Sequence, residues 1–120
     1  MTRVPAMAVK NASEAALSTD GMRVLVERRW PAGKRRDDVA VDLWLREAAP
    51  SEALRRWFRR APRGWDDYVV RYRAEMAQRR DILRLLHELG RRGPVTLLHT
   101  TRDPEHNNAT ALRTILDELS

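Results

Sequence analysis

The stretch PVTLLHTTRDPEHNNATALRTILDEL (Pro94–Leu119) decides the fold, because it joins an apolar run to an amphipathic helix through a short polar turn. Pro94–Thr100 follows the residues GRRG, which are typical of a helix end before a strand. Asp103 and Pro104 predict the start of the helix, with Asp103 as its N-cap and Pro104 at the first helical position. The helix would bury a stripe made of Leu112, Ile115, Leu116 and Leu119.

A second strand is predicted over Met22–Trp30, where Val24 and Val26 alternate with polar neighbours around Leu25. More than sixty mostly helical residues separate it from Pro94–Thr100, which is enough for a parallel crossover. A weaker strand is predicted over Arg3–Val9. The predicted helices cover Val39–Ala49, Glu52–Arg60, Trp65–Gln78 and Ile82–Leu89. This order predicts an α/β fold, a small single domain over residues 1–120 with a few-stranded, mostly parallel sheet flanked by several helices.

Size and composition exclude several classes of protein. The chain has 120 residues and 42% hydrophobic residues, which suits one modest core. It contains no cysteine, so disulfides and thiolate metal sites are excluded. Three scattered histidines offer no standard metal-ligand spacing, and we expect neither a metal nor a cofactor. No apolar run is long enough for a membrane span and no secretory signal is recognised, so we expect a cytoplasmic protein.

The charge is strongly positive and is carried by arginine. The net charge is +6, and all but Lys10 and Lys34 of the 23 basic residues are arginine. The planar arginine fork suits phosphate and carboxylate, which favours an anionic ligand or nucleic acid. The alternative is a GC-rich coding bias that places most arginines on solvated helix faces.

Two loops are predicted to meet at one edge of the sheet, because the carboxyl ends of parallel strands lie together and open α/β sheets bind ligands there. The first loop runs from Glu27 to Asp38 and the second from Thr100 to His106. Both lead to helix N-termini, whose dipoles favour anions. The candidate ligand-binding residues at this edge are Arg28, Trp30, Arg36, Arg102 and Asn107, with His106 as a candidate proton donor.

Each candidate also has a structural interpretation. Arg102 would either bind an anion or pair with a nearby carboxylate. His106 would be a proton donor, an anion ligand or an exposed first-turn histidine. Trp30 would stack on a ring or cover the core. Glu27, beside several arginines, is expected to have a lowered pKa and to act as a salt-bridge partner.

The motifs GMRVLVERRWPAG, DLWLREAAPS, LRRWF, RYRAEM and RGPVTLLHTTRDPEHNNA resemble, in order and spacing, the YeaO-like bacterial domain of unknown function, family 488. The resemblance covers residues 21–120, and residues 1–20 match poorly. It implies a small α/β fold but no activity. The residues at the family's motif positions are Arg28, Trp30, Arg102, Asp103, His106 and Asn107.

Four polar positions depart from the family pattern. Glu27 replaces an aspartate, Ala32 an arginine, Arg60 a histidine, and Asn108 the second histidine of an H-N-H motif. Either the ligand differs from that of other members, or an activity has been lost while the fold and a binding role remain.

Two functional hypotheses follow. In the first, an anionic small ligand, bearing phosphate or carboxylate or being a nucleotide, binds at the carboxyl edge of the sheet. In the second, nucleic acid binds to arginines on the helix faces, although no reading motif is recognised. The helix arginines concerned are Arg55, Arg56, Arg59, Arg60, Arg63, Arg71, Arg79 and Arg80.

Overall fold

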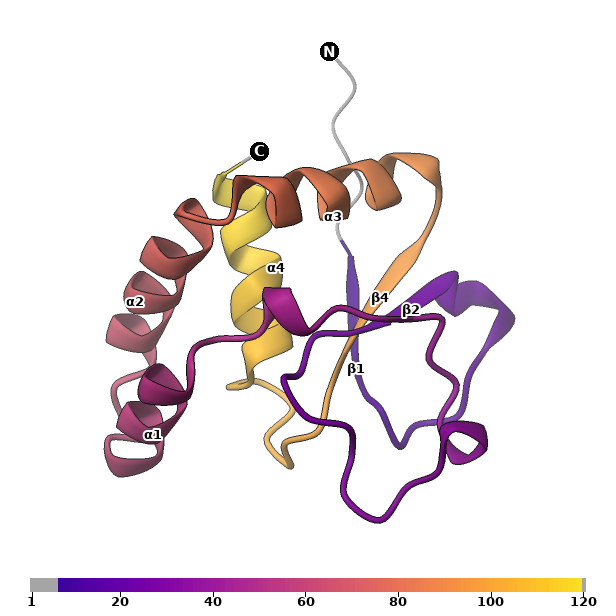
Figure 1. Ribbon diagram of the computed structural model, residues 1–120, viewed down its shortest axis with the longest axis horizontal. Helices are drawn as coiled ribbons and strands as arrows, with labels where there is room; N and C mark the ends of the chain where they lie inside the picture. Colours follow the sequence, from indigo (N-terminus) through magenta and orange to yellow (C-terminus); the bar gives the residue numbers. More distant parts are fainter. Residues whose placement is uncertain (1–6, 120) are drawn as a thin grey trace.

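The computed structural model describes residues 7–119 and has the predicted α/β architecture (Figure 1). Four strands form one sheet in the order β1-β4-β2-β3, and all three pairings are parallel. The strands are β1 (Ala8–Asn11), β2 (Met22–Leu25), β3 (Leu43–Trp44) and β4 (Val95–His99). The helices are α1 (Glu52–Arg60), α2 (Trp65–Ala77), α3 (Arg80–Arg92) and α4 (Asn108–Glu118).

Alternation along the central strands divides the core into two unequal parts. Val24 and Leu97 face the helices and join the larger cluster, which includes Tyr72 and Leu112. Leu25 faces the other way and packs with a smaller cluster of Ala12, Val39 and Leu98. One face of the sheet is therefore covered by helices, and the other by the chain segment between β2 and α1 (Figure 1).

The predicted helix over Val39–Ala49 is wrong, because this segment contains the edge strand β3 and a short 3-10 turn. The amide of Asp42 donates to the carbonyl of Arg23 at 2.8 Å, and that of Leu45 donates to the carbonyl of Leu25 at 2.9 Å. These bonds add the segment to the open edge of β2. The backbone groups of this segment are thus satisfied by strand pairing. The spacing of its apolar residues had indicated a helix because it does not register such long-range pairing.

The predicted start of the last helix is also wrong. α4 begins at Asn108 and its N-cap is Asn107, so Asp103 is not the helix cap. The two strong strand predictions are confirmed, although β2 ends at Leu25 and is shorter than predicted. The weaker prediction, Arg3–Val9, overlaps β1 only at Ala8 and Val9, because β1 runs from Ala8 to Asn11. The part of the Arg3–Val9 prediction before Met7 lies outside the described residues. None of the helices within residues 7–119 has the length and apolar character needed to cross a membrane.

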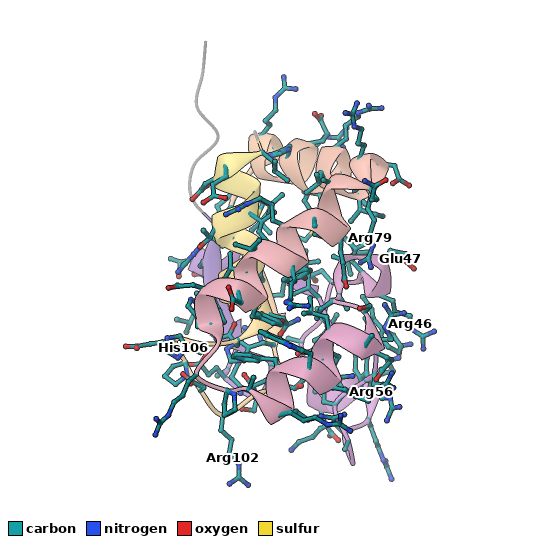
Figure 2. The ribbon with its side chains drawn as sticks, turned by 90° about the vertical axis from the view of Figure 1, so that its left-hand side faces the viewer. Arg46, Glu47, Arg56, Arg79, Arg102 and His106 are labelled. Atoms are coloured by element: carbon teal, nitrogen blue, oxygen red, sulfur yellow. The ribbon has the colours of Figure 1, made fainter. Side chains whose placement is uncertain are left out.

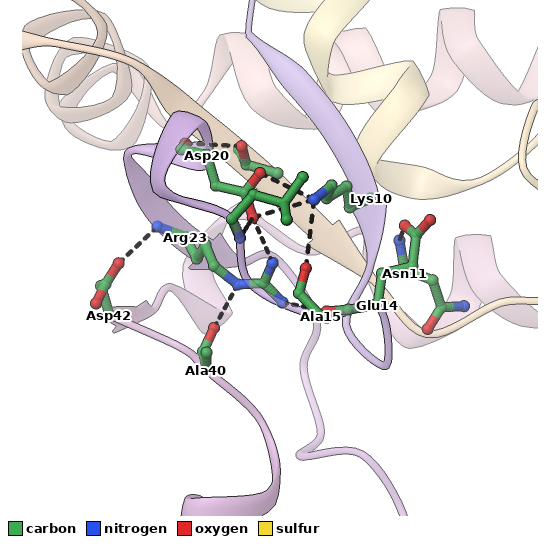
Figure 3. Close-up of polar contacts among 10 residues, drawn as sticks. Lys10, Asn11, Glu14, Ala15, Asp20, Arg23, Ala40 and Asp42 are labelled. Atoms are coloured by element: carbon green, nitrogen blue, oxygen red, sulfur yellow. Dashed lines mark hydrogen bonds and ion pairs between the residues drawn. The ribbon is translucent and has the colours of Figure 1, made fainter.

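A buried ion pair anchors the start of β2 (Figure 3). The guanidinium of Arg23, only 3% exposed, lies 2.7 Å from the Asp20 carboxylate, which also accepts from Lys10 of β1 at 2.9 Å. Arg23 further donates to the carbonyls of Glu14 and Ala40 at 3.0 and 2.7 Å. The network therefore joins β1, β2 and the segment leading to β3, and each charge in it has a partner, as burial requires.

We expect Asp20→Asn to destabilise the protein at neutral pH and to have less effect in acid. Hydrogen bonds from Lys10, the Leu17 amide and Arg23 lower the pKa of Asp20 from 3.8 to about 2. A lowered carboxyl pKa stabilises the folded state above pH 3.8, and that stability is lost as the pH falls through the folded value near 2. Denaturant unfolding from pH 7 to pH 2 should show the gap between variant and wild type closing. Exposed Asp37→Asn is the control, and a gap that does not depend on pH would contradict the account.

Candidate functional site

A small cavity opens at the carboxyl edge of the sheet, where the sequence predicts a ligand site. Its volume is about 180 Å³. The walls come from the ends of β2 and β4, from α1 and α2, and from the turn before α4. The lining residues are Glu27, Pro50, Arg55, Phe58, Arg59, Tyr68, Thr100, Thr101, His106, Asn107 and Asn108.

The pairing of β2 with β4 brings Glu27 to the cavity. The register sets Leu25 beside Leu98, and the amide of Val26 extends the ladder by donating to the Leu98 carbonyl at 3.2 Å. Just beyond the ladder, Oε1 of Glu27 accepts from the Thr100 amide at 3.2 Å and from the Thr100 hydroxyl at 3.4 Å. The two strand ends are thus joined through one carboxyl group.

Burial raises the pKa of Glu27, and this outweighs the hydrogen bonds from Thr100 and the more distant charge of Arg55, which lower it. The expectation of a lowered pKa and a salt-bridge role is therefore wrong. Within residues 7–119 no basic side chain forms an ion pair with this carboxyl group. The arginines of the loop that follows it do not line the cavity, and the arginine that acts on Glu27 electrostatically, Arg55, comes from α1.

Helix α1 supplies the positive charge of the cavity. Ser51 caps it, accepting from the Leu54 amide at 3.1 Å. Arg55 is partly buried and pairs with Glu52 at 3.1 Å, whereas Arg59 is exposed and has no ion pair among the described residues. Arg59 is therefore available to a bound anion, and Arg55 keeps guanidinium donors beyond the one that binds Glu52.

An aromatic row supports one side of the cavity. The ring of Tyr68 stacks on Phe58 with centroids 4.4 Å apart and on Trp65 at 5.5 Å. Trp65 in turn lies 4.8 Å from the ring of His106. Packing within this row restricts the rotation of the rings. It therefore fixes the positions of the Tyr68 hydroxyl and the His106 imidazole.

The turn between β4 and α4 is held by Asp103. Its Oδ1 accepts from the amides of Glu105 and His106 at 2.9 and 3.0 Å, and these bonds lower the pKa of the carboxyl group. Its Oδ2 lies 3.6 Å from Nδ1 of His106. Asp103 thus accepts hydrogen bonds from backbone N–H groups, as an N-cap would. These N–H groups belong to the turn before α4 and not to the helix itself. His106 is half-exposed beside the cavity.

Both asparagines after His106 have structural bonds. The side chain of Asn107 accepts from the Thr110 amide at 2.8 Å and donates to the Asp103 carbonyl at 3.0 Å. Asn108, at the position where the family usually has histidine, donates from Nδ2 to the carbonyl of Val26 at 2.6 Å. This last bond ties the start of α4 to the end of β2, so the departure at Asn108 serves packing at the cavity wall.

Four of the five predicted ligand-binding residues, all but Asn107, do not line the cavity. Arg36 covers the rings of Trp30 and Trp44, at 4.4 and 5.2 Å from their centroids, on the opposite face of the sheet. Trp30 thus covers the smaller core, which was its structural interpretation. Arg28 reaches the Pro50 carbonyl at 3.4 Å and lines a separate, more open hollow that includes Arg79.

Arg102 is exposed, has no hydrogen bond or ion pair with another described residue, and extends away from the molecule (Figure 2). Of the predicted residues, only His106 and Asn107 line the cavity. The contributions of Arg55, Arg59 and Tyr68 were not predicted from the sequence, where the two arginines were assigned to a helix face and Tyr68 was not singled out. Among the described residues no group of three histidines or carboxylates is positioned to hold a metal ion.

Comparison with known proteins places these features in a family. Residues 6–120 match the model of the inactive DUF488-N3 subclade. The chain is 33% identical to the uncharacterized protein YeaO of Escherichia coli (strain K12), over 92% of this chain and 96% of that protein. It is 37% identical to the uncharacterized protein Rv3073c of Mycobacterium tuberculosis (strain H37Rv), over 82% of each chain. No solved structure matches significantly.

We expect Asn107→Ala to lower the free energy of unfolding by about 1 kcal/mol, because removing an N-cap acceptor leaves the Thr110 amide unpaired. Asn107→Ser retains a short acceptor and should recover most of that loss. Urea unfolding of both variants measures the difference. Equal stability of the alanine and serine variants would contradict a capping role.

We expect Glu27→Gln to become more stabilising as the pH rises. Because the folded pKa is raised above the ordinary 4.5, Glu27 in wild type contributes full stability below pH 4.5 and loses it as the pH passes through the folded value. The glutamine variant avoids that loss and keeps an acceptor for the Thr100 amide. Denaturant unfolding between pH 4 and pH 8 tests this, with exposed Glu105→Gln as control. A variant that becomes relatively less stable towards pH 8 would overturn the assignment.

Proposed function

Since the chain belongs to the YeaO-like DUF488 family, within its inactive N3 subclade, we propose that it binds a small anionic ligand in the cavity at the carboxyl edge of its sheet without converting it. The observation that carries the proposal is the pair of arginines, Arg55 and Arg59, on the wall of this cavity. The ligand bears a phosphate or carboxylate group.

Charge and hydrogen-bond donors support an anion here. Guanidinium groups form strong charge-assisted bonds with phosphate and carboxylate oxygens, often as paired parallel bonds. Arg59 has no competing carboxylate among the described residues, and Arg55 has one, Glu52. The N-terminus of α4 lies on the same cavity at Asn107 and Asn108, and its dipole adds positive potential.

The size of the cavity limits the ligand. A volume of about 180 Å³ is below the range of roughly 300–1,000 Å³ common for pockets that enclose drug-sized molecules. We therefore propose a metabolite of a few carbon atoms, or one terminal group of a larger molecule whose remainder lies outside. A cytoplasmic location fits such a ligand and stays a prediction.

A binding role without turnover is supported by two observations. The family model that the chain matches is described as inactive. His106, the predicted proton donor, lies with its ring against Trp65 and its side chain is 47% exposed, so it is open to solvent at the edge of the cavity. We assign His106 to the rim of the binding cavity.

The nucleic-acid alternative ranks second because several of its arginines have partners within the molecule. Arg71 lies 4.3 Å over the ring of Trp57. Arg79 donates to the carbonyls of Glu47 and Ala49 at 2.8 and 2.6 Å, beside Glu47 as seen in Figure 2. A duplex or single strand that bound through the helix arginines would lose affinity steeply with salt.

We expect Arg55→Ala and Arg59→Ala each to weaken binding of inorganic phosphate by about tenfold, the effect of losing one charge-assisted hydrogen bond. Isothermal titration calorimetry at constant ionic strength measures this. Arg102→Ala is the matched control, since it removes the same charge from an exposed position near the same edge. Failure of wild type to bind phosphate, or equal weakening by Arg102→Ala, would refute the cavity as the site.

A further inference from the structure

Three buried polar groups on the cavity wall have unused hydrogen-bonding capacity. Glu27, Tyr68 and Asn108 are only 6%, 3% and 6% exposed. Both bonds to the Glu27 carboxyl go to Oε1, from Thr100, so among residues 7–119 no donor meets Oε2. The three residues line the cavity, so water or a ligand in it can reach their unpaired oxygen atoms.

The other two groups reinforce the pattern. The Tyr68 hydroxyl makes no hydrogen bond to any described residue. The Tyr68 ring is held in place by stacking on Phe58 and Trp65. The amide of Asn108 faces the Val26 carbonyl, which accepts only, so the nitrogen is turned to the strand and the oxygen Oδ1 stays without a donor. The buried part of the cavity therefore offers three oxygen atoms as acceptors.

The opposite polarity lies nearer to solvent. Arg55 is partly buried and Arg59 is exposed, and both are donors without acceptor capacity. The acceptor oxygens therefore come from the more buried lining residues, and the cationic donors come from the more exposed ones. A simple anion would be complementary to the outer part alone and would leave the buried oxygens unpaired.

We propose that the ligand is a small zwitterion, whose ammonium group binds Glu27, Tyr68 and Asn108 while its anionic group binds Arg55 and Arg59. This inference rests on the proposed function and specifies its ligand. An ammonium group carries three N–H donors, one for each oxygen. Its charge also compensates the buried carboxylate, which has no ion pair among the described residues. Small amino acids and aminoalkyl phosphates have this chemistry.

The test compares O-phosphoethanolamine with ethyl phosphate, which lacks only the ammonium group. Isothermal titration calorimetry at pH 7.5 should give wild type a preference of about tenfold or more for the ammonium ligand, as a buried charge pair implies. Glu27→Gln should reduce that preference to about threefold or less while ethyl phosphate still binds, because the arginines are intact. Glu105→Gln, which removes a carboxylate from the adjacent turn outside the cavity, should keep the full preference.

The outcomes separate the two proposals. If wild type binds both ligands equally, the zwitterion assignment is wrong and the anion site stands. If wild type binds neither, the proposed function itself fails. Should Glu27→Gln not fold, Tyr68→Phe removes one acceptor and leaves the stacked ring, so it should reduce the preference without lowering the melting temperature. An unchanged preference in a folded Tyr68→Phe or Glu27→Gln protein would overturn the inference.

Discussion

The parallel pairing of β2 with β4 is the constraint on which the rest of the structure depends. Its register places Leu25 beside Leu98, so the next residues, Val26 and Glu27, meet the end of β4. The Val26 carbonyl then binds Asn108, and the Glu27 carboxyl binds Thr100. A shift of one residue would turn the apolar side chains to the wrong faces and separate these groups. The same pairing thus sets both the core and the cavity.

The cavity combines acidic, basic and neutral polar side chains that the surrounding helices hold in place. The side chains of the buried residues Glu27, Tyr68 and Asn108 line it, together with two more exposed arginines of α1. The polar groups are held by backbone bonds and by stacked rings, so they are positioned before any ligand arrives. Preorganisation of this kind lowers the entropic cost of binding.

The sequence predicted the α/β class and the two central strands, because apolar alternation and strand–helix order are strong local signals. A cavity lies at the edge of the sheet where a ligand site was expected. It failed where tertiary pairing outweighed local pattern. The residues 43–44 joined the edge of β2, although their spacing indicated a helix. Asp103 and Pro104 gave a good helix-start signal, but Asn107 caps α4 instead. The basic loop after Glu27 was expected at the cavity, yet Trp30 and Arg36 cover the opposite face, since the loop also shields the smaller core. No pattern in the sequence indicates which of these two faces of the sheet the loop covers.

The most direct test of the cavity as a ligand site is a crystal structure determined after soaking in inorganic phosphate. The account predicts density for a tetrahedral anion in the cavity, within hydrogen-bond distance of the Arg55 and Arg59 guanidinium groups. An empty cavity, with phosphate found instead on the exposed arginines of α2 and α3 or beside Arg102, would contradict it.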